Sequence, residues 1–155
     1  MEAFVVHAID PSIVTQVRQT LVAPGYGHPV HRELARGTGP CRACLRTFTV
    51  GTEERLLFTF DPFAGSAHLS QPDPVFIHAD ECELRTDAGF PSGLRGMPIA
   101  AECHHEDGAI SAPQPLTGGS EDHDIRALLT RANVRFLHLR HGEAGCFIAR
   151  VDRGE

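Results

Sequence analysis

The chain has 155 residues, a formal net charge of −6 at pH 7 and no lysine, so all fourteen of its basic residues are arginine. This length fits one domain of ordinary size. The absence of lysine excludes Schiff-base, pyridoxal and phosphate-loop chemistry, each of which uses a lysine amine. The acidic balance argues against a nucleic-acid partner.

The composition also predicts where the protein works. No apolar run approaches the roughly 20 residues of a membrane span, and the start Met1–Phe4 lacks the basic residues of a signal peptide. We therefore expect a cytoplasmic protein with no membrane partner. The arginine-only composition points to a bacterial source with a high genomic GC content. Five cysteines suit a reduced protein better than a disulfide framework.

The first forty residues predict a strand, a helix and a loop. Residues 4–9 form a β-branched run, and Asp10 with Pro11 then supplies a helix start for residues 12–21. Residues 22–40 are rich in glycine and proline and show no hydrophobic period. They predict a long loop, of the kind that is either functional or mobile.

The middle of the chain predicts short strands. Residues 46–50 and 54–60 are expected to form a hairpin through Gly51 and Thr52, and 75–78 a further strand. Asp80, with Glu83 three positions later, predicts the opening of a helical turn.

The last third predicts two hairpins around a helix. The hairpins are expected at 98–112 and 133–151, and the helix at 120–131, where acidic residues precede basic ones along the dipole. If Leu139 pairs with Cys146, Arg135 lies opposite Arg150, which would favour an anion between them unless the register differs.

Together these elements predict a fold class. We expect an α+β protein with a single domain over residues 1–155, a largely antiparallel sheet, two main helices and long loops. The expected core consists of Phe58, Phe60, Phe76, Ile77, Leu128, Leu129, Phe136 and Ile148.

The candidate chemistry begins at the Cys-x-x-Cys pair formed by Cys41 and Cys44, whose spacing lets two thiolates bind one Zn²⁺. A structural zinc needs four ligands, and His78 with Cys82 is the best second pair. If a cofactor is bound, zinc is the one that this spacing suits; otherwise none is expected. Two alternatives stay open, in which the cysteines only pack in a metal-free core or form a redox pair.

Other groups compete for a role. Cys103 and His105 share one face of a strand while His104 points to the other, so the two histidines do not chelate together. His28 and His31 in the long loop form a further possible ligand pair. An acidic run is best interpreted as a solvated face, and it consists of Asp80, Glu81, Glu83 and Asp87.

These motifs, taken in order, resemble a known family. They are Cys41–Arg46, Leu56–Leu57 leading to Asp61–Phe63, Val75–His78 with Cys82, Gly145–Phe147 and Val151–Arg153. They resemble the family called domain of unknown function 1203, small and mainly bacterial proteins with no assigned activity. The resemblance spans Cys41 to Arg153 and implies a shared framework to which Cys41, Cys44, His78, Cys82 and Cys146 belong.

Two classes of function therefore remain. One is a metal- or small-ligand-binding domain without catalysis, and the other is a thiol- or metal-dependent enzyme, for which the sequence assigns no catalytic residue. A closed four-ligand site favours the first, and an open coordination position or an activated thiol in a cleft favours the second.

Overall fold

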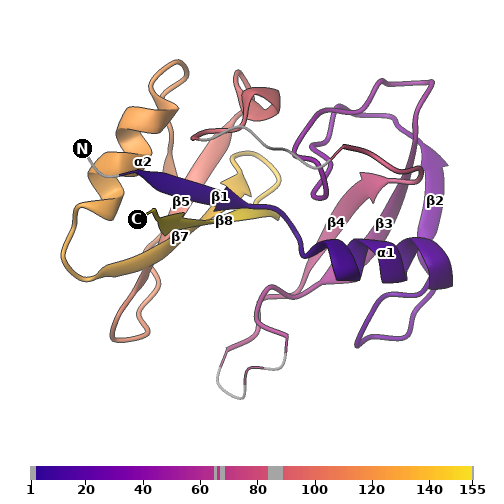
Figure 1. The fold of residues 1–155 in the computed structure, drawn as a ribbon, viewed down its shortest axis with the longest axis horizontal. Coiled ribbons are helices and arrows are strands. Elements are labelled where there is room, and N and C mark those ends of the chain that lie inside the picture. Colours follow the sequence, from indigo (N-terminus) through magenta and orange to yellow (C-terminus); the bar gives the residue numbers. More distant parts are fainter. Residues whose placement is uncertain (1–2, 65, 67–68, 84–88, 155) are drawn as a thin grey trace. The chain divides into compact units, whose positions relative to one another are not determined.

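A computed structural model describes residues 3–64, 66, 69–83 and 89–154 of the protein. Over these residues the chain has two α-helices and eight strands, all paired antiparallel, in two separate sheets (Figure 1). The α+β class, the antiparallel sheets and the two helices are confirmed. Neither helix combines the length and apolar character that a membrane crossing requires, within the part of the chain described.

The chain divides into two compact units. Residues 9–84 form a continuous unit, and residues 1–8 with 85–155 form a discontinuous unit. The predicted single domain over residues 1–155 stays a prediction. Each unit is described separately below.

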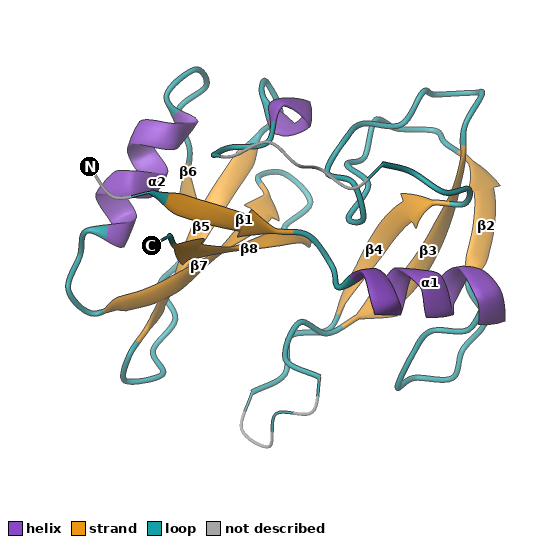
Figure 2. Cartoon of the chain, viewed as in Figure 1, coloured by secondary structure: helices purple, strands orange, loops and turns teal. Residues whose placement is uncertain are grey.

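The continuous unit packs helix α1 (Pro11–Thr20) against strands β2 (His31–Leu34), β3 (Glu54–Phe60) and β4 (Asp73–His78), in the sheet order β2-β3-β4 (Figure 2). The helix begins as predicted, because the Asp10 side chain accepts a hydrogen bond from the Ser12 N–H at 2.8 Å. One cluster joins the helix to the sheet, and among its buried members are Val14, Val17, Leu56, Phe58, Val75 and Ile77.

Three local predictions for this unit are wrong. The predicted loop at 22–40 contains β2, a polar strand held to β3 by its ladder and by the pair Arg32–Glu54. Residues 46–50 do not form a strand, so the predicted hairpin with 54–60 is absent from this described segment. Strand β3 pairs with β2 and β4 instead. Residues 80–83 form a bend and an irregular segment, not a helical turn.

The discontinuous unit contains a five-stranded sheet in the order β1-β8-β7-β5-β6. The strands are β1 (Phe4–His7), β5 (Ile99–His105), β6 (Gln114–Pro115), β7 (Val134–His141) and β8 (Phe147–Arg153). Helix α2 (Glu121–Leu129) and a short 3-10 helix, η1 (Ser92–Leu94), complete it. In Figure 1, β1 lies beside β8, its hydrogen-bonded partner.

The hairpins of this unit differ from the prediction in register. Leu139 pairs with Ala149 instead of Cys146, so Arg150 lies opposite His138 and not opposite Arg135. The argument for an anion between the two arginines therefore fails. In the other hairpin, β5 pairs with β6, while the predicted partner segment at 109–112 contributes only a bridge at Ile110.

Of the eight expected core residues, six are buried. Phe60 and Phe76 are half-buried. Strand β5, which lies between β7 and β6, is buried along both faces, and one of these faces carries charged and polar groups.

Candidate metal centre

A tight turn at Cys41–Leu45 places the first two thiols. The Leu45 N–H donates to the Cys41 carbonyl at 2.8 Å, and Leu45 has a left-handed backbone with φ of 59°. A buried non-glycine residue in that region is uncommon and marks a backbone held by its surroundings. Both thiols are buried at this turn.

Strand β4 ends beside the turn and brings the other two donors. The Arg42 N–H donates to the Phe76 carbonyl at 2.9 Å, so the backbone of the turn is tied to β4. The His78 N–H donates to Cys41 Sγ at 3.3 Å, as the Ala43 N–H does at 3.4 Å. Cys82 follows four residues after His78, half-buried.

The four predicted ligands therefore converge. Cys41 Sγ lies 4.0 Å from Cys82 Sγ, and Cys44 Sγ lies 3.5 Å from His78 Nδ1. The four donor atoms all lie within 4.8 Å of one another. With bonds of about 2.3 Å to sulfur and 2.0–2.1 Å to nitrogen, the donors of a tetrahedral zinc are separated by roughly 3.5–3.8 Å. The cluster can hold a metal ion with little movement.

Two side chains outside the cluster orient it. Glu53 Oε2 lies 3.1 Å from His78 Nε2, which orients the ring so that Nδ1 faces the sulfurs. Arg18 of α1 donates to Cys82 Sγ at 3.3 Å and to the His78 carbonyl at 3.1 Å. Neither residue has a spacing signal in the sequence, and both were missed by the sequence analysis.

The electrostatics of the cluster favour separated charges in the metal-free protein. Hydrogen bonds from Cys41 and Cys44, supported by His78 and Arg18, hold the pKa of Cys82 far below its ordinary value. Hydrogen bonds to the Cys41 and Cys82 sulfurs raise the pKa of His78 to about 10, and those same two partners raise the pKa of Cys44. These opposite shifts favour a deprotonated Cys82 and a protonated His78, and a metal cation would take the place of the proton on His78 Nδ1.

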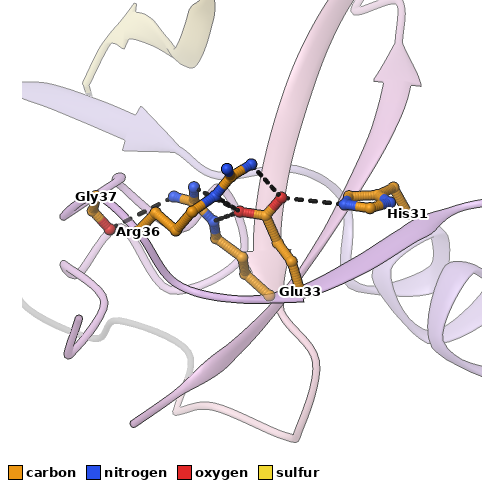
Figure 3. Close-up of polar contacts among 5 residues, drawn as sticks. His31, Glu33, Arg36 and Gly37 are labelled. Atoms are coloured by element: carbon orange, nitrogen blue, oxygen red, sulfur yellow. Dashed lines mark hydrogen bonds and ion pairs between the residues drawn. The ribbon is translucent and has the colours of Figure 1, made fainter. Parts of the chain in front are cut away.

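Aromatic rings pack around His78, and a network of ion pairs contacts these rings. The Phe48 ring lies 4.5 Å from the His78 ring, and the Arg55 guanidinium stacks on Phe76 at 3.7 Å. Arg55 also donates to Glu33 at 2.9 Å. Figure 3 shows the Glu33 carboxylate between the His31 imidazole and the Arg36 guanidinium. Hydrogen bonds from Arg36 and then Arg55 lower the pKa of Glu33 to about 2.

A cleft of about 460 Å³ opens onto the cluster. Its wall contains Cys44, His78 and Cys82. The rest of the lining is mostly polar and acidic and includes Glu53, Glu54, Asp80, Glu81 and Glu83. The predicted acidic run therefore borders the centre, although Asp87 lies outside the described residues.

The competing candidates do not join this cluster. His28 contacts Thr59, and His31 contacts Glu33. Cys103, His105 and Cys146 belong to the discontinuous unit, and within the described part of the chain none of them lies in a group of side chains that could bind one metal ion.

Comparison with known proteins adds a family. The family model described as "Protein of unknown function (DUF1203)" matches residues 38–153. The chain belongs to this family. The match begins just before the Cys-x-x-Cys turn, so all four donors lie within the DUF1203 region, as the sequence resemblance implied. No curated protein and no solved structure matches the chain.

Proposed function

We propose that this DUF1203 protein binds one zinc ion through Cys41, Cys44, His78 and Cys82, as a closed metal-binding centre without catalysis. The observation that supports it most directly is the convergence of four donors from two segments at separations of 3.5 and 4.0 Å. Thiolate and imidazole donors in a tetrahedral arrangement favour zinc over calcium, magnesium or manganese.

The surroundings support the same proposal. Three thiolates and one zinc ion leave a net charge of −1, which the Arg18 guanidinium beside Cys82 offsets. The Glu53 carboxylate holds the far nitrogen of His78, an arrangement common at zinc-bound histidines. The ion would join the turn at Cys41 to the end of β4 and so stabilise the continuous unit directly.

Metal content tests the proposal. Protein purified without chelator or added metal should contain about one zinc per chain by mass spectrometry. Cobalt substitution should give the intense sulfur-to-cobalt absorption of a thiolate site. Cys44→Ser should lower the zinc content and the free energy of unfolding, whereas Cys146→Ser, which alters a cysteine outside the cluster, should leave both unchanged. Full zinc content in Cys44→Ser would refute the assignment.

A second candidate, a thiol- or metal-dependent enzyme, draws on the cleft that exposes Cys82. In that case one protein donor would leave the metal and water or substrate would take its position. Cobalt spectra separate the two functions, because a four-coordinate site without water is insensitive to added azide and an open site is not. An unchanged spectrum would favour the closed centre.

A further inference from the structure

A second group of metal-binding side chains lies in the discontinuous unit, on the polar face of its sheet. Glu102 of β5 pairs directly with His138 of β7, and His104 follows Glu102 two positions along β5. Because side chains alternate along a strand, all three lie on the same face of neighbouring strands. All three are buried.

One carboxylate oxygen is the meeting point of the two imidazoles. Glu102 Oε1 lies 2.8 Å from His104 Nε2 and 4.0 Å from His138 Nδ1. The three donor atoms are all within 4.8 Å of one another. Ligands about 2.1 Å from one ion lie roughly 3 Å apart at right angles and roughly 4 Å apart on opposite sides. The group therefore matches three positions around a single ion.

The other carboxylate oxygen has a separate role. Glu102 Oε2 lies 3.2 Å from Arg140 Nε, and Arg140 also donates to the Gly145 carbonyl at 2.9 Å. The Glu102–Arg140 ion pair explains why a glutamate is buried here. It does not explain why two imidazole nitrogens lie close to the other oxygen, Oε1. An anchored Oε2 instead leaves Oε1 oriented as a single-oxygen metal ligand.

Aromatic rings fix the imidazoles. Phe136 stacks on His104 at 4.6 Å with an interplanar angle of 13°, and Phe147 contacts His138 edge-on at 4.9 Å. Both donor nitrogens are thereby held toward the carboxylate, as a preformed site requires.

We infer that Glu102, His104 and His138 form a second metal site, for a divalent first-row ion such as Mn²⁺ or Fe²⁺. Two imidazoles and one carboxylate are the nitrogen and oxygen donors these ions accept, and three protein ligands leave positions for water or a small ligand. The site is independent of the zinc proposal, since it shares no residue with the cysteine cluster.

Manganese binding tests the inference on the intact protein as purified. The fall of the free Mn²⁺ electron paramagnetic resonance signal should show one bound ion per chain. His104→Gln and His138→Gln should each weaken that binding at least tenfold. Two controls should bind as wild type, namely His105→Gln, whose imidazole bonds to Ser111, and Asp80→Asn, which changes the acidic cleft.

A measurement on the unaltered protein covers the case in which the histidine variants fail to fold. Bound Mn²⁺ should broaden the imidazole nuclear magnetic resonance signals of His104 and His138 before those of other histidines. Absence of Mn²⁺ binding, unchanged affinity in folded variants, or broadening centred on the acidic cleft would overturn the inference and leave Glu102 as a buried ion-pair partner only.

Discussion

Gly39→Ala probes how the cysteine turn is held in place. Gly39 has φ of 102°, and a Cβ added there would lie 2.6 and 2.8 Å from two atoms of the Phe48 ring. The ring cannot withdraw freely, because Phe48 is buried against His78, and its backbone N–H donates to the Thr38 carbonyl at 2.8 Å. The added methyl group therefore displaces either the ring or the turn.

The cost has two parts. A non-glycine residue with this backbone conformation costs about 1–2 kcal/mol, and one extra methyl group in a packed site costs about 1–3 kcal/mol. We expect Gly39→Ala to lower the free energy of unfolding by about 2–5 kcal/mol. Zinc affinity should also fall, because Phe48 supports the ring of a proposed ligand.

Gly37→Ala is the matched control, two residues earlier. A Cβ there meets only Arg55 Nη1 at 3.8 Å, an ordinary contact. Gly37→Ala should change the free energy of unfolding little. It can even raise it by about 0.4–1 kcal/mol, because alanine restricts the unfolded chain more than glycine does. Urea unfolding of both variants, monitored by circular dichroism, gives the comparison. Equal stabilities for the two variants would show that the Gly39–Phe48 contact does not constrain the turn.

Two further predictions concern the partners of the cluster and its supporting network. Glu53→Gln removes the charge that holds His78 Nε2 and should weaken zinc binding about 10- to 100-fold. Competition with a chromophoric chelator measures this affinity, and the free energy of unfolding of the metal-free protein should change little. An unaltered zinc affinity would contradict the orienting role of Glu53. Glu33 has its pKa lowered from 4.5 to about 2, so its contribution to stability is complete above pH 4.5 and is lost as the pH falls toward 2. Metal-free Glu33→Gln should therefore lose less stability than metal-free wild type between those pH values, and parallel acid-unfolding curves would disprove the linkage.

The elements that the sequence predicted best are those with an apolar period or a capping residue. Strand β3 has the predicted bounds, since Leu56 and Phe58 alternate with less buried neighbours and face one core. Helix α1 begins at the predicted Asp10 and Pro11. Strand β2 has no such signal, because ion pairs and its backbone ladder hold His31–Leu34 to β3.

The two proposed metal sites show a different limit of sequence-based prediction. Cys41, Cys44, His78 and Cys82 were selected by spacing, since each pair is close in the chain and only the two pairs had to meet in space. The second group depends on the pairing of β5 with β7, which no spacing predicts. Glu102 and His138 were therefore missed. His104 was set aside because its neighbour His105 points to the other face of the strand and cannot bind the same ion. Register, not composition, decides such sites.

The division of the chain also sets an order of events during synthesis. Every residue of the continuous unit, including the four sulfur and imidazole donors, precedes residue 85, whereas the discontinuous unit needs β8 to pair with β1. At about 5–20 residues per second, the ribosome takes roughly 4–14 s to translate residues 85–155. The continuous unit, with the four proposed ligands, can thus fold on the ribosome before β8 is made, and β1 stays an unpaired strand until then.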